Sequence, residues 1–155
     1  MEFREPTELI EFLELYPGPV VDLALQARLV LLEMLWPVSE IYYDANSAVC
    51  SGFTYTGRVS DNFMNLAVYA DHVTLIFPQG VHLNDPQGVL KGGGNQVRHI
   101  RLAGIETLRQ AAVIDLLNQA AIQAPGSRGE TEPIVVVKVM KGRKRRPAAD
   151  IDRGM

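Results

Sequence analysis

Cysteine is almost absent from this sequence, since Cys50 is the only one among 155 residues. A single cysteine cannot form an intrachain disulfide, which excludes a disulfide-stabilised secreted scaffold and favours a reducing cytoplasm. No apolar run reaches the ~18 residues of a membrane span. Acidic residues interrupt the first dozen positions, where a signal peptide needs an uncharged segment. The sequence therefore predicts a soluble cytoplasmic protein with no membrane partner.

Residue types that hold metals or perform catalysis are also scarce. The only histidines are His72, His82 and His99, and none lies at metal-ligand spacing to Cys50. No nucleophile with a base and an orienting acid can be assigned from spacing. The sequence thus carries no catalytic signature and implies no cofactor.

Charge is distributed unevenly along the chain. Residues 1–137 carry 8 Lys and Arg against 16 Asp and Glu, whereas residues 138–155 carry 7 against 2. We predict a single acidic domain over residues 1–141 and a disordered basic tail over residues 142–155, because the tail has few apolar residues to bury. Such a basic run binds nucleic acid or acidic partners through charge alone, whereas the acidic domain repels nucleic acid.

Helical periodicity predicts helices over residues 7–15, 20–35 and 107–121. The second has few charges and is apolar over most of its surface, which predicts a central buried helix. Its charged residues are Asp22, Arg28 and Glu33, and its main apolar stripe is Leu25, Leu29, Leu32 and Trp36.

Strand-length segments rich in β-branched and aromatic residues occupy the middle of the chain and its end. They cover residues 48–56, 64–70, 73–78, 96–102 and 134–139, and a helical turn is predicted near residues 86–90. Helices first, strands grouped together and then a closing helix indicate an α+β fold. We predict two layers, with one mostly antiparallel sheet packed against helices.

The stretch from His72 to Arg101 contains a specific pattern of apolar, glycine and Asp-Pro positions. This pattern resembles the YdhG-like family, a bacterial domain of unknown function, and the resemblance covers about residues 20–122. The residues that carry it are His72, Val73, Leu75, Phe77, Gly80, Leu83, Asp85, Pro86, Gly88, Leu90, Gly92, Gly94 and Arg98. The resemblance implies an α+β fold with an antiparallel sheet. Some relatives are labelled frataxin-like iron chaperones, which implies weakly held iron. Asn95 stands where the family often has lysine.

The acidic residues of the first predicted helix are the natural place to look for the iron-binding surface that the resemblance implies. Glu8, Glu11 and Glu14 recur every three residues and therefore spread over 120° of the helix surface. Such a spread is typical of a solvated face. An open carboxylate face that holds a divalent ion weakly remains the alternative.

Arg98 is the most informative single residue of the predicted sheet. Strand alternation places it on the same face as Ile100 and Leu102, so we predict a buried guanidinium paired with Asp85 first and Glu40 second. The pair could fasten the long loop to the sheet, or it could leave donors free to bind an anion.

These features lead us to predict a small binding or chaperone-like domain, with a cleft for a small anion or a weakly held metal ion. The candidate ligand-binding residues are Tyr42, Asp44, Asn46, Tyr55, Asp85, Lys91, Gly92, Gly94 and Arg98. Purely structural roles for the tyrosines and glycines remain open.

Two other functional classes also remain open. One is an enzyme with an unrecognised site near Tyr42, Asp85 and Arg98. The other is an interaction module that acts through the basic tail, or a homodimer formed through the outer edge of strand 134–139.

Overall fold

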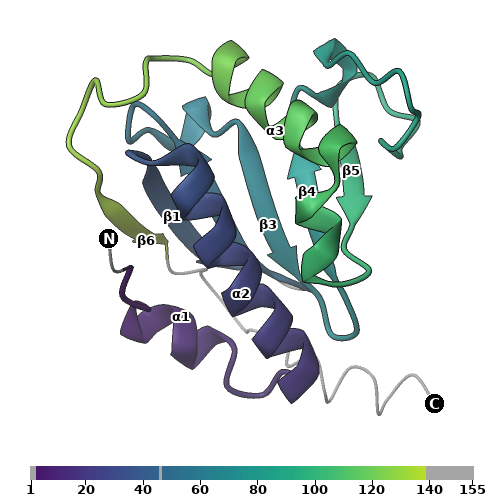
Figure 1. Ribbon diagram of the computed structural model, residues 1–155. Helices are drawn as coiled ribbons and strands as arrows, with labels where there is room; N and C mark the ends of the chain where they lie inside the picture. Colours follow the sequence, from purple (N-terminus) through teal and green to yellow (C-terminus); the bar gives the residue numbers. More distant parts are fainter. Residues whose placement is uncertain (1–2, 46, 139–155) are drawn as a thin grey trace.

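A computed structural model describes residues 3–45 and 47–138 (Figure 1). The predicted tail, 142–155, and the candidate residue Asn46 lie outside the described residues. The helices are α1 (Thr7–Phe12), α2 (Gly18–Leu35) and α3 (Ala111–Gln123), with 3-10 turns η1 (Val59–Asp61), η2 (Gly80–His82) and η3 (Ile105–Arg109). The strands are β1 (Ser39–Asp44), β2 (Val49–Thr54), β3 (Met64–Val68), β4 (Val73–Phe77), β5 (Arg98–Arg101) and β6 (Val135–Lys138).

The six strands form one sheet in the order β5-β4-β3-β2-β1-β6. Neighbouring strands are antiparallel except β1 and β6, which are parallel because the chain crosses over through α3 before it returns to the edge. The prediction of an α+β fold with a mostly antiparallel sheet is confirmed. Strands β3 and β4 form a hairpin, and the Tyr69 N–H donates to the His72 carbonyl across its turn.

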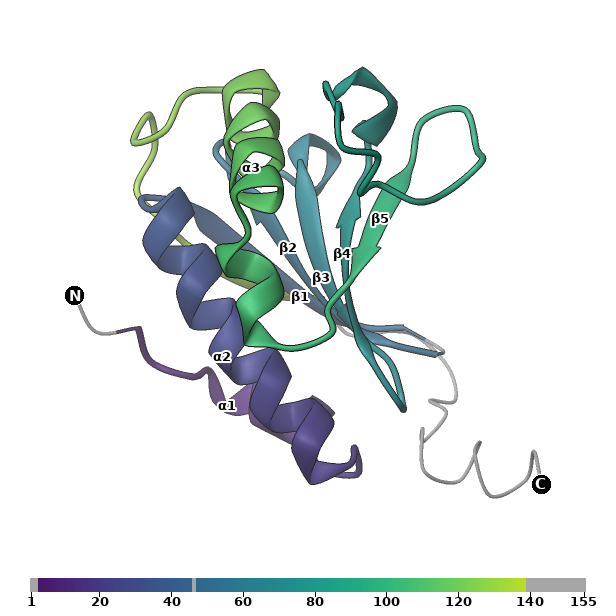
Figure 2. The same ribbon diagram turned by 45° about the vertical axis from the view of Figure 1, so that its right-hand side comes forward.

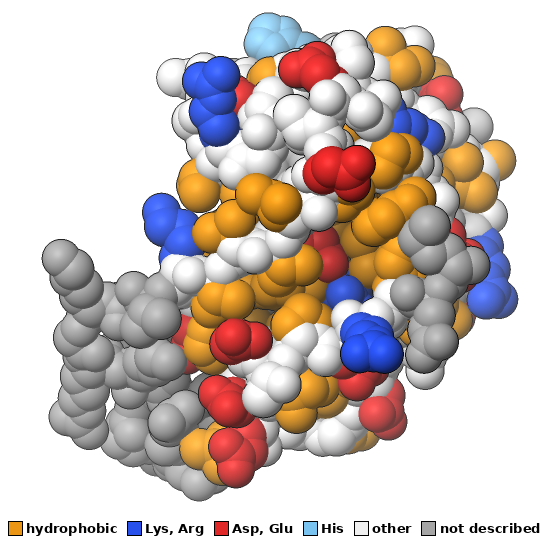
Figure 3. All heavy atoms as spheres, turned by 90° about the vertical axis from the view of Figure 1, so that its left-hand side faces the viewer, with side chains coloured by type: hydrophobic (Ala, Val, Ile, Leu, Met, Phe, Trp, Pro, Cys, Tyr) orange, Lys and Arg blue, Asp and Glu red, His pale blue; other side chains and the backbone are white. Residues whose placement is uncertain are grey.

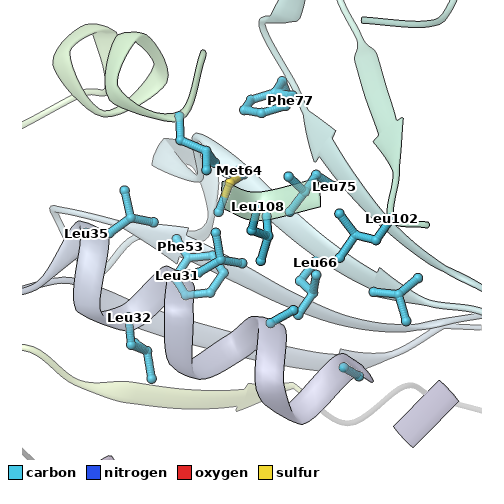
Figure 4. Packing of buried hydrophobic residues seen from close by; sticks show 14 of the residues in the cluster. Leu31, Leu32, Leu35, Phe53, Met64, Leu66, Leu75, Phe77, Leu102 and Leu108 are labelled. Carbon is cyan, nitrogen blue, oxygen red and sulfur yellow. The ribbon is translucent and has the colours of Figure 1, made fainter. Parts of the chain in front are cut away.

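The helices form the second layer. Figures 1 and 2 show α2 and α3 lying over the same face of the sheet. Side chains from both helices and from the strands form one large buried cluster between the layers. Figure 4 shows part of this cluster, with leucines of α2 facing the apolar side chains of the central strands.

Helix α2 is buried against the sheet, as predicted, but its buried face overlaps the predicted stripe only in part. Leu32 of that stripe is fully buried but Leu29 is 37% exposed, and the inward face also contains Ala24, Ala27, Arg28, Leu31 and Leu35. The two faces are adjacent on a helix that is apolar nearly all round, so periodicity alone does not choose between them. The helix ends where Trp36 precedes Pro37, as expected, because proline disfavours helical geometry in the preceding residue.

Strand β1 was missed from the sequence. Its residues, SEIYYD, mix polar and aromatic types without a clean alternation, although five of the six are buried. They are covered because β1 lies between β2 and β6 and beneath α2.

The long connection between β4 and β5 contains no helical turn at residues 86–90, so that prediction is wrong. Asp85 instead closes a tight turn, in which its carbonyl accepts from the Gly88 N–H at 3.1 Å. The Asp85 carboxylate accepts from the backbone N–H groups of Val89 and Leu90 at 3.0 and 2.9 Å. Asp85 therefore organises the loop itself, and a short aspartate side chain that satisfies backbone donors is favoured in turns.

Candidate functional site

Arg98 lies at the edge of the sheet, where the structure contradicts its predicted pairing. The predicted face of the strand on which Arg98 lies is confirmed. Arg98 lies opposite Phe77 and Ile100 lies opposite Leu75, and Phe77 and Leu75 are both buried in the core. The guanidinium, however, turns outward and donates to the carbonyls of Gly94 and Val97 at 2.7 and 2.8 Å. Among the described residues, Arg98 forms no ion pair with Asp85 or Glu40.

The glycine-rich loop before β5 is exposed. Lys91 pairs with His99 through two backbone hydrogen bonds of 2.9 Å, which extend the sheet by one bridge. Gly92 has a positive φ of 122°, which a residue with a Cβ would rarely adopt. With Gly94 accepting from Arg98, the contacts that the structure gives this loop are those of a turn. Anion binding by the loop stays a prediction.

The candidate residues do not gather in one cleft. Tyr42 and Asp44 lie buried on β1, whereas Arg98 lies on β5, four strand spacings away. At about 4.8 Å per strand the separation is about 19 Å. Tyr55 follows β2, where it is buried and donates its hydroxyl to the Leu35 carbonyl at 3.0 Å. A single site that contains both Tyr42 and Arg98 is therefore not formed.

A buried polar cluster lies beneath α2 and contains Tyr42 with two residues that the sequence did not place together. The Arg28 Nε–H donates to Glu40 Oε2 at 3.0 Å and to the Tyr42 hydroxyl oxygen at 2.8 Å. Arg28 Nη2 donates to Glu40 Oε1 at 3.0 Å, so the ion pair is bidentate. The Tyr42 hydroxyl in turn donates to Glu40 Oε2. The Arg28 and Glu40 side chains are only 4% and 5% exposed.

The segment before α1 contributes the last partner of Arg28. The Arg4 carbonyl accepts a second bond from Arg28 Nη2 at 2.9 Å, and the ring of Phe3 lies 4.9 Å from that of Trp36. This contact holds the segment against the end of α2.

One nitrogen of the cluster has no partner. Nη1 of Arg28 is buried and makes no hydrogen bond, and it is the only such side-chain atom in the described part of the chain. An unsatisfied buried donor costs about 1–3 kcal/mol, and more on a charged group. Nη1 is therefore the one donor of this buried ion pair that the protein itself leaves unsatisfied among the described residues.

A cavity of about 240 Å³ adjoins the cluster. Arg28 and Glu40 line it together with Arg4, and the remaining wall is apolar: Phe3, Trp36, Val38, Pro133, Ile134 and Val135. Figure 3 looks onto this side of the molecule and shows hydrophobic side chains around a hollow in which acidic and basic atoms are visible. We call this cavity the Arg28 pocket.

Two other hollows are less suited to a specific ligand. One of about 190 Å³ lies by the end of α3 and is lined by uncharged residues, among them Phe63, Phe77 and Gln123. The other, of about 200 Å³, lies on the opposite face of the sheet beside His72 and His99. Neither is lined by a buried polar side-chain atom that lacks a partner.

Burial and charge together fix the ionisation of the cluster. Desolvation lowers the pKa of Arg28, but the hydrogen bonds and charge of Glu40, with a smaller contribution from Tyr42, outweigh it and raise the pKa overall. Burial, reinforced by the negative charge of Glu40, raises the pKa of Tyr42. Arg28 is therefore cationic and Tyr42 neutral.

Alkaline titration gives a first test of this burial. Burial raises the pKa of Tyr42, Tyr43, Tyr55 and Tyr69 above that of free tyrosine. The folded state therefore holds protons that the unfolded state releases, and this contribution to stability is complete below about pH 10 and is lost as the pH rises further. We expect these four tyrosines to remain protonated at about pH 10 in the folded protein, and tyrosinate absorbance to appear with unfolding. Half-ionised tyrosines in folded protein at that pH would contradict the burial.

The arrangement offers no compact ligand set for a metal. Within residues 3–45 and 47–138, no group of three or more His, Cys, Asp and Glu side chains could hold a metal ion. The glutamates of the first helical segment, Glu5, Glu8, Glu11 and Glu14, are all exposed. Weak iron binding on that face stays a prediction. None of the helices in the described part of the chain is long and apolar enough to cross a membrane.

Arg28 and Glu40 were both visible in the sequence, but not as a pair. The available signal was the spacing of Arg28, which lies one helical turn from both Ala24 and Leu32 on a helix with few charges. A lone arginine on an apolar helix face requires a buried acceptor. Glu40 was assigned instead to Arg98, as its second candidate partner.

Comparison with known proteins yields no relative: no family model, no curated protein and no solved structure matches the chain. The resemblance to the YdhG-like family therefore stays a prediction.

Proposed function

We propose that this protein is a small ligand-binding domain, and that its ligand is a small apolar molecule whose neutral carbonyl oxygen enters the Arg28 pocket. The unpartnered Nη1 of Arg28, buried beside a cavity with mostly apolar walls, is the observation that carries the proposal. That nitrogen has almost no accessible surface, so a carbonyl oxygen reaches it from the pocket only when the pocket wall shifts. The bond would then give one N–H of Nη1 an acceptor and reduce the cost of the unsatisfied donor.

Charge decides between a carbonyl and the small anion expected from the sequence. Glu40 already neutralises Arg28 through two hydrogen bonds, and Tyr42 is neutral. A second carboxylate in this pocket would lie close to Glu40, and two like charges in a desolvated site repel each other strongly. A neutral acceptor takes the same hydrogen bond without adding charge.

The size of the pocket limits the ligand. Its volume of about 240 Å³ is below the ~300–1,000 Å³ of pockets that hold drug-sized molecules. A short branched amide such as isobutyramide matches both the apolar wall and the single donor. At the affinity per atom that small ligands reach, we expect a dissociation constant on the order of 1 mM.

The alternative of an enzyme has less support. Its proposed residues, Tyr42, Asp85 and Arg98, are dispersed over the sheet and the loop. The basic tail lies outside the described residues and supplies no structural support for an interaction module.

The test is a titration of the full chain with isobutyramide and, separately, with isobutyrate at neutral pH, followed by NMR shifts of the Arg28 side chain. We expect isobutyramide to bind at least ~10-fold more tightly than isobutyrate, which corresponds to 1.4 kcal/mol.

Val135→Trp should abolish isobutyramide binding, because the larger ring fills the pocket from its exposed rim. Val81→Trp is the matched control, since Val81 is also partly exposed but does not line the pocket. Tighter binding of isobutyrate, or no response of Arg28 to the amide, would contradict the proposal.

A further inference from the structure

We infer that the carbonyl which enters the Arg28 pocket belongs to a peptide in extended conformation, which adds to the sheet along the outer edge of β6 and projects a glutamine side chain over the pocket rim. This inference rests on the proposed function and deepens it. It names the class of ligand and a second surface that the ligand uses.

Strand β6 ends the sheet, and its outer side has no strand partner among residues 3–45 and 47–138. It pairs with β1 alone, and no backbone hydrogen bond reaches its other side from the described residues. Both backbone groups of Ile134 point toward β1, because its N–H donates to the Ser39 hydroxyl at 3.0 Å and its carbonyl accepts from the Glu40 N–H at 2.9 Å. Since backbone groups alternate along a strand, those of Val135 and Val137 point outward. An extended peptide can pair with these groups as a further strand.

The free edge and the pocket meet at Val135. The register pairs Val135 with Glu40 and Val137 with Tyr42, so their side chains lie on the face that α2 covers. Val135 is 52% exposed and lines the Arg28 pocket. A residue added opposite Val135 would place its side chain on this same face, about 4.5–5.5 Å from the Val135 Cβ. A glutamine there has the length to bring its amide oxygen back over the rim toward Arg28.

A second copy of this chain fits the site less well than a separate peptide. The edge strands that a second copy would offer are its own β6, with the sequence VVVK, and β5, with the sequence RHIR. None of these side chains carries a carbonyl, so the donor of Arg28 would remain unsatisfied. The pocket therefore favours a partner peptide with a side-chain amide.

The experiment uses the full chain and the peptide acetyl-Thr-Val-Gln-Val-Thr-amide, with one variant that has leucine in place of glutamine and one with N-methyl groups on alternate backbone nitrogens. We expect the parent peptide to bind more tightly than isobutyramide and to protect the Val135 and Val137 amides from hydrogen exchange. Replacing the glutamine should weaken binding by about 10-fold, the effect of one lost hydrogen bond, and methylating several backbone nitrogens should weaken it further.

A protein variant separates the two proposals. Val137→Pro removes an outward N–H from an edge strand, where proline is tolerated, and Val137 does not line the pocket. It should weaken peptide binding about 10-fold and leave isobutyramide binding unchanged.

The strand pairing would be overturned if isobutyramide binds but the peptide binds no more tightly than isobutyramide does. The proposed function would then remain intact. Failure of both ligands would overturn the two together. Concentration-dependent self-association that protects the Val135 and Val137 amides would identify a second copy as the partner and overturn the inference.

Discussion

Replacing Arg28 with methionine should lower the free energy of unfolding by about 3–5 kcal/mol, the usual cost of leaving one member of a buried ion pair uncompensated. Methionine retains most of the apolar volume of the side chain, so the loss reports charge and hydrogen bonding rather than a cavity. Glu40 would keep only the Tyr42 hydroxyl among the partners that it has in this cluster. Denaturant unfolding of the two proteins measures the difference directly.

The matched control is the double variant Arg28→Met with Glu40→Gln. Glutamine retains the shape of the glutamate and removes its charge, so the double variant should recover part of the stability lost by Arg28→Met alone. A double variant less stable than Arg28→Met, or a single variant within about 0.5 kcal/mol of the parent, would show that Arg28 and Glu40 do not form a buried pair.

Replacing Phe53 with alanine should lower the free energy of unfolding by about 3–5 kcal/mol, the range for removing a buried aromatic ring. Phe53 lies in the middle of the sheet on β2, is fully buried, and belongs to the same core cluster as Leu31 and Leu35 of α2 (Figure 4). The ring fills the space between sheet and helix, so its loss leaves a cavity that rigid neighbours cannot fill.

Val59→Ala serves as the control for Phe53→Ala. Val59 is 41% exposed and lies outside the core, so its truncation should change the free energy of unfolding by about 0.5 kcal/mol or less. Equal losses for the two variants would contradict the assignment of β2 to the core of the sheet.

The sequence was sufficient for most of the fold because local patterns determine most of its elements. The strands at 64–68, 73–77 and 135–138 lie within the predicted segments, and the Trp36-Pro37 stop ends α2 at the predicted residue. Leu9 and Phe12 are buried and Glu8 and Glu11 exposed, as the spacing of the first helix indicates. Strand β1 escaped because its coverage comes from α2, which folds back over it, and from β6, which is distant in sequence.

The candidate site was less accessible, because it depends on which strands become neighbours. The face on which Arg98 lies follows from alternation along one strand, but its partner depends on the position of β5 at the far edge of the sheet. Glu40 pairs with Arg28, twelve residues away, because α2 folds back over β1. Tyr42, one of the predicted site residues, lies in this cluster. Its partners required the three-dimensional arrangement.

The most direct test of the proposed ligand site is a crystal structure of the full chain soaked with isobutyramide. The amide oxygen is expected about 2.9 Å from Nη1 of Arg28, with the branched carbons against Val38 and Val135 and the Arg28–Glu40 ion pair intact. A structure in which the amide is absent from the pocket, while Nη1 donates to another group of the protein, would contradict it.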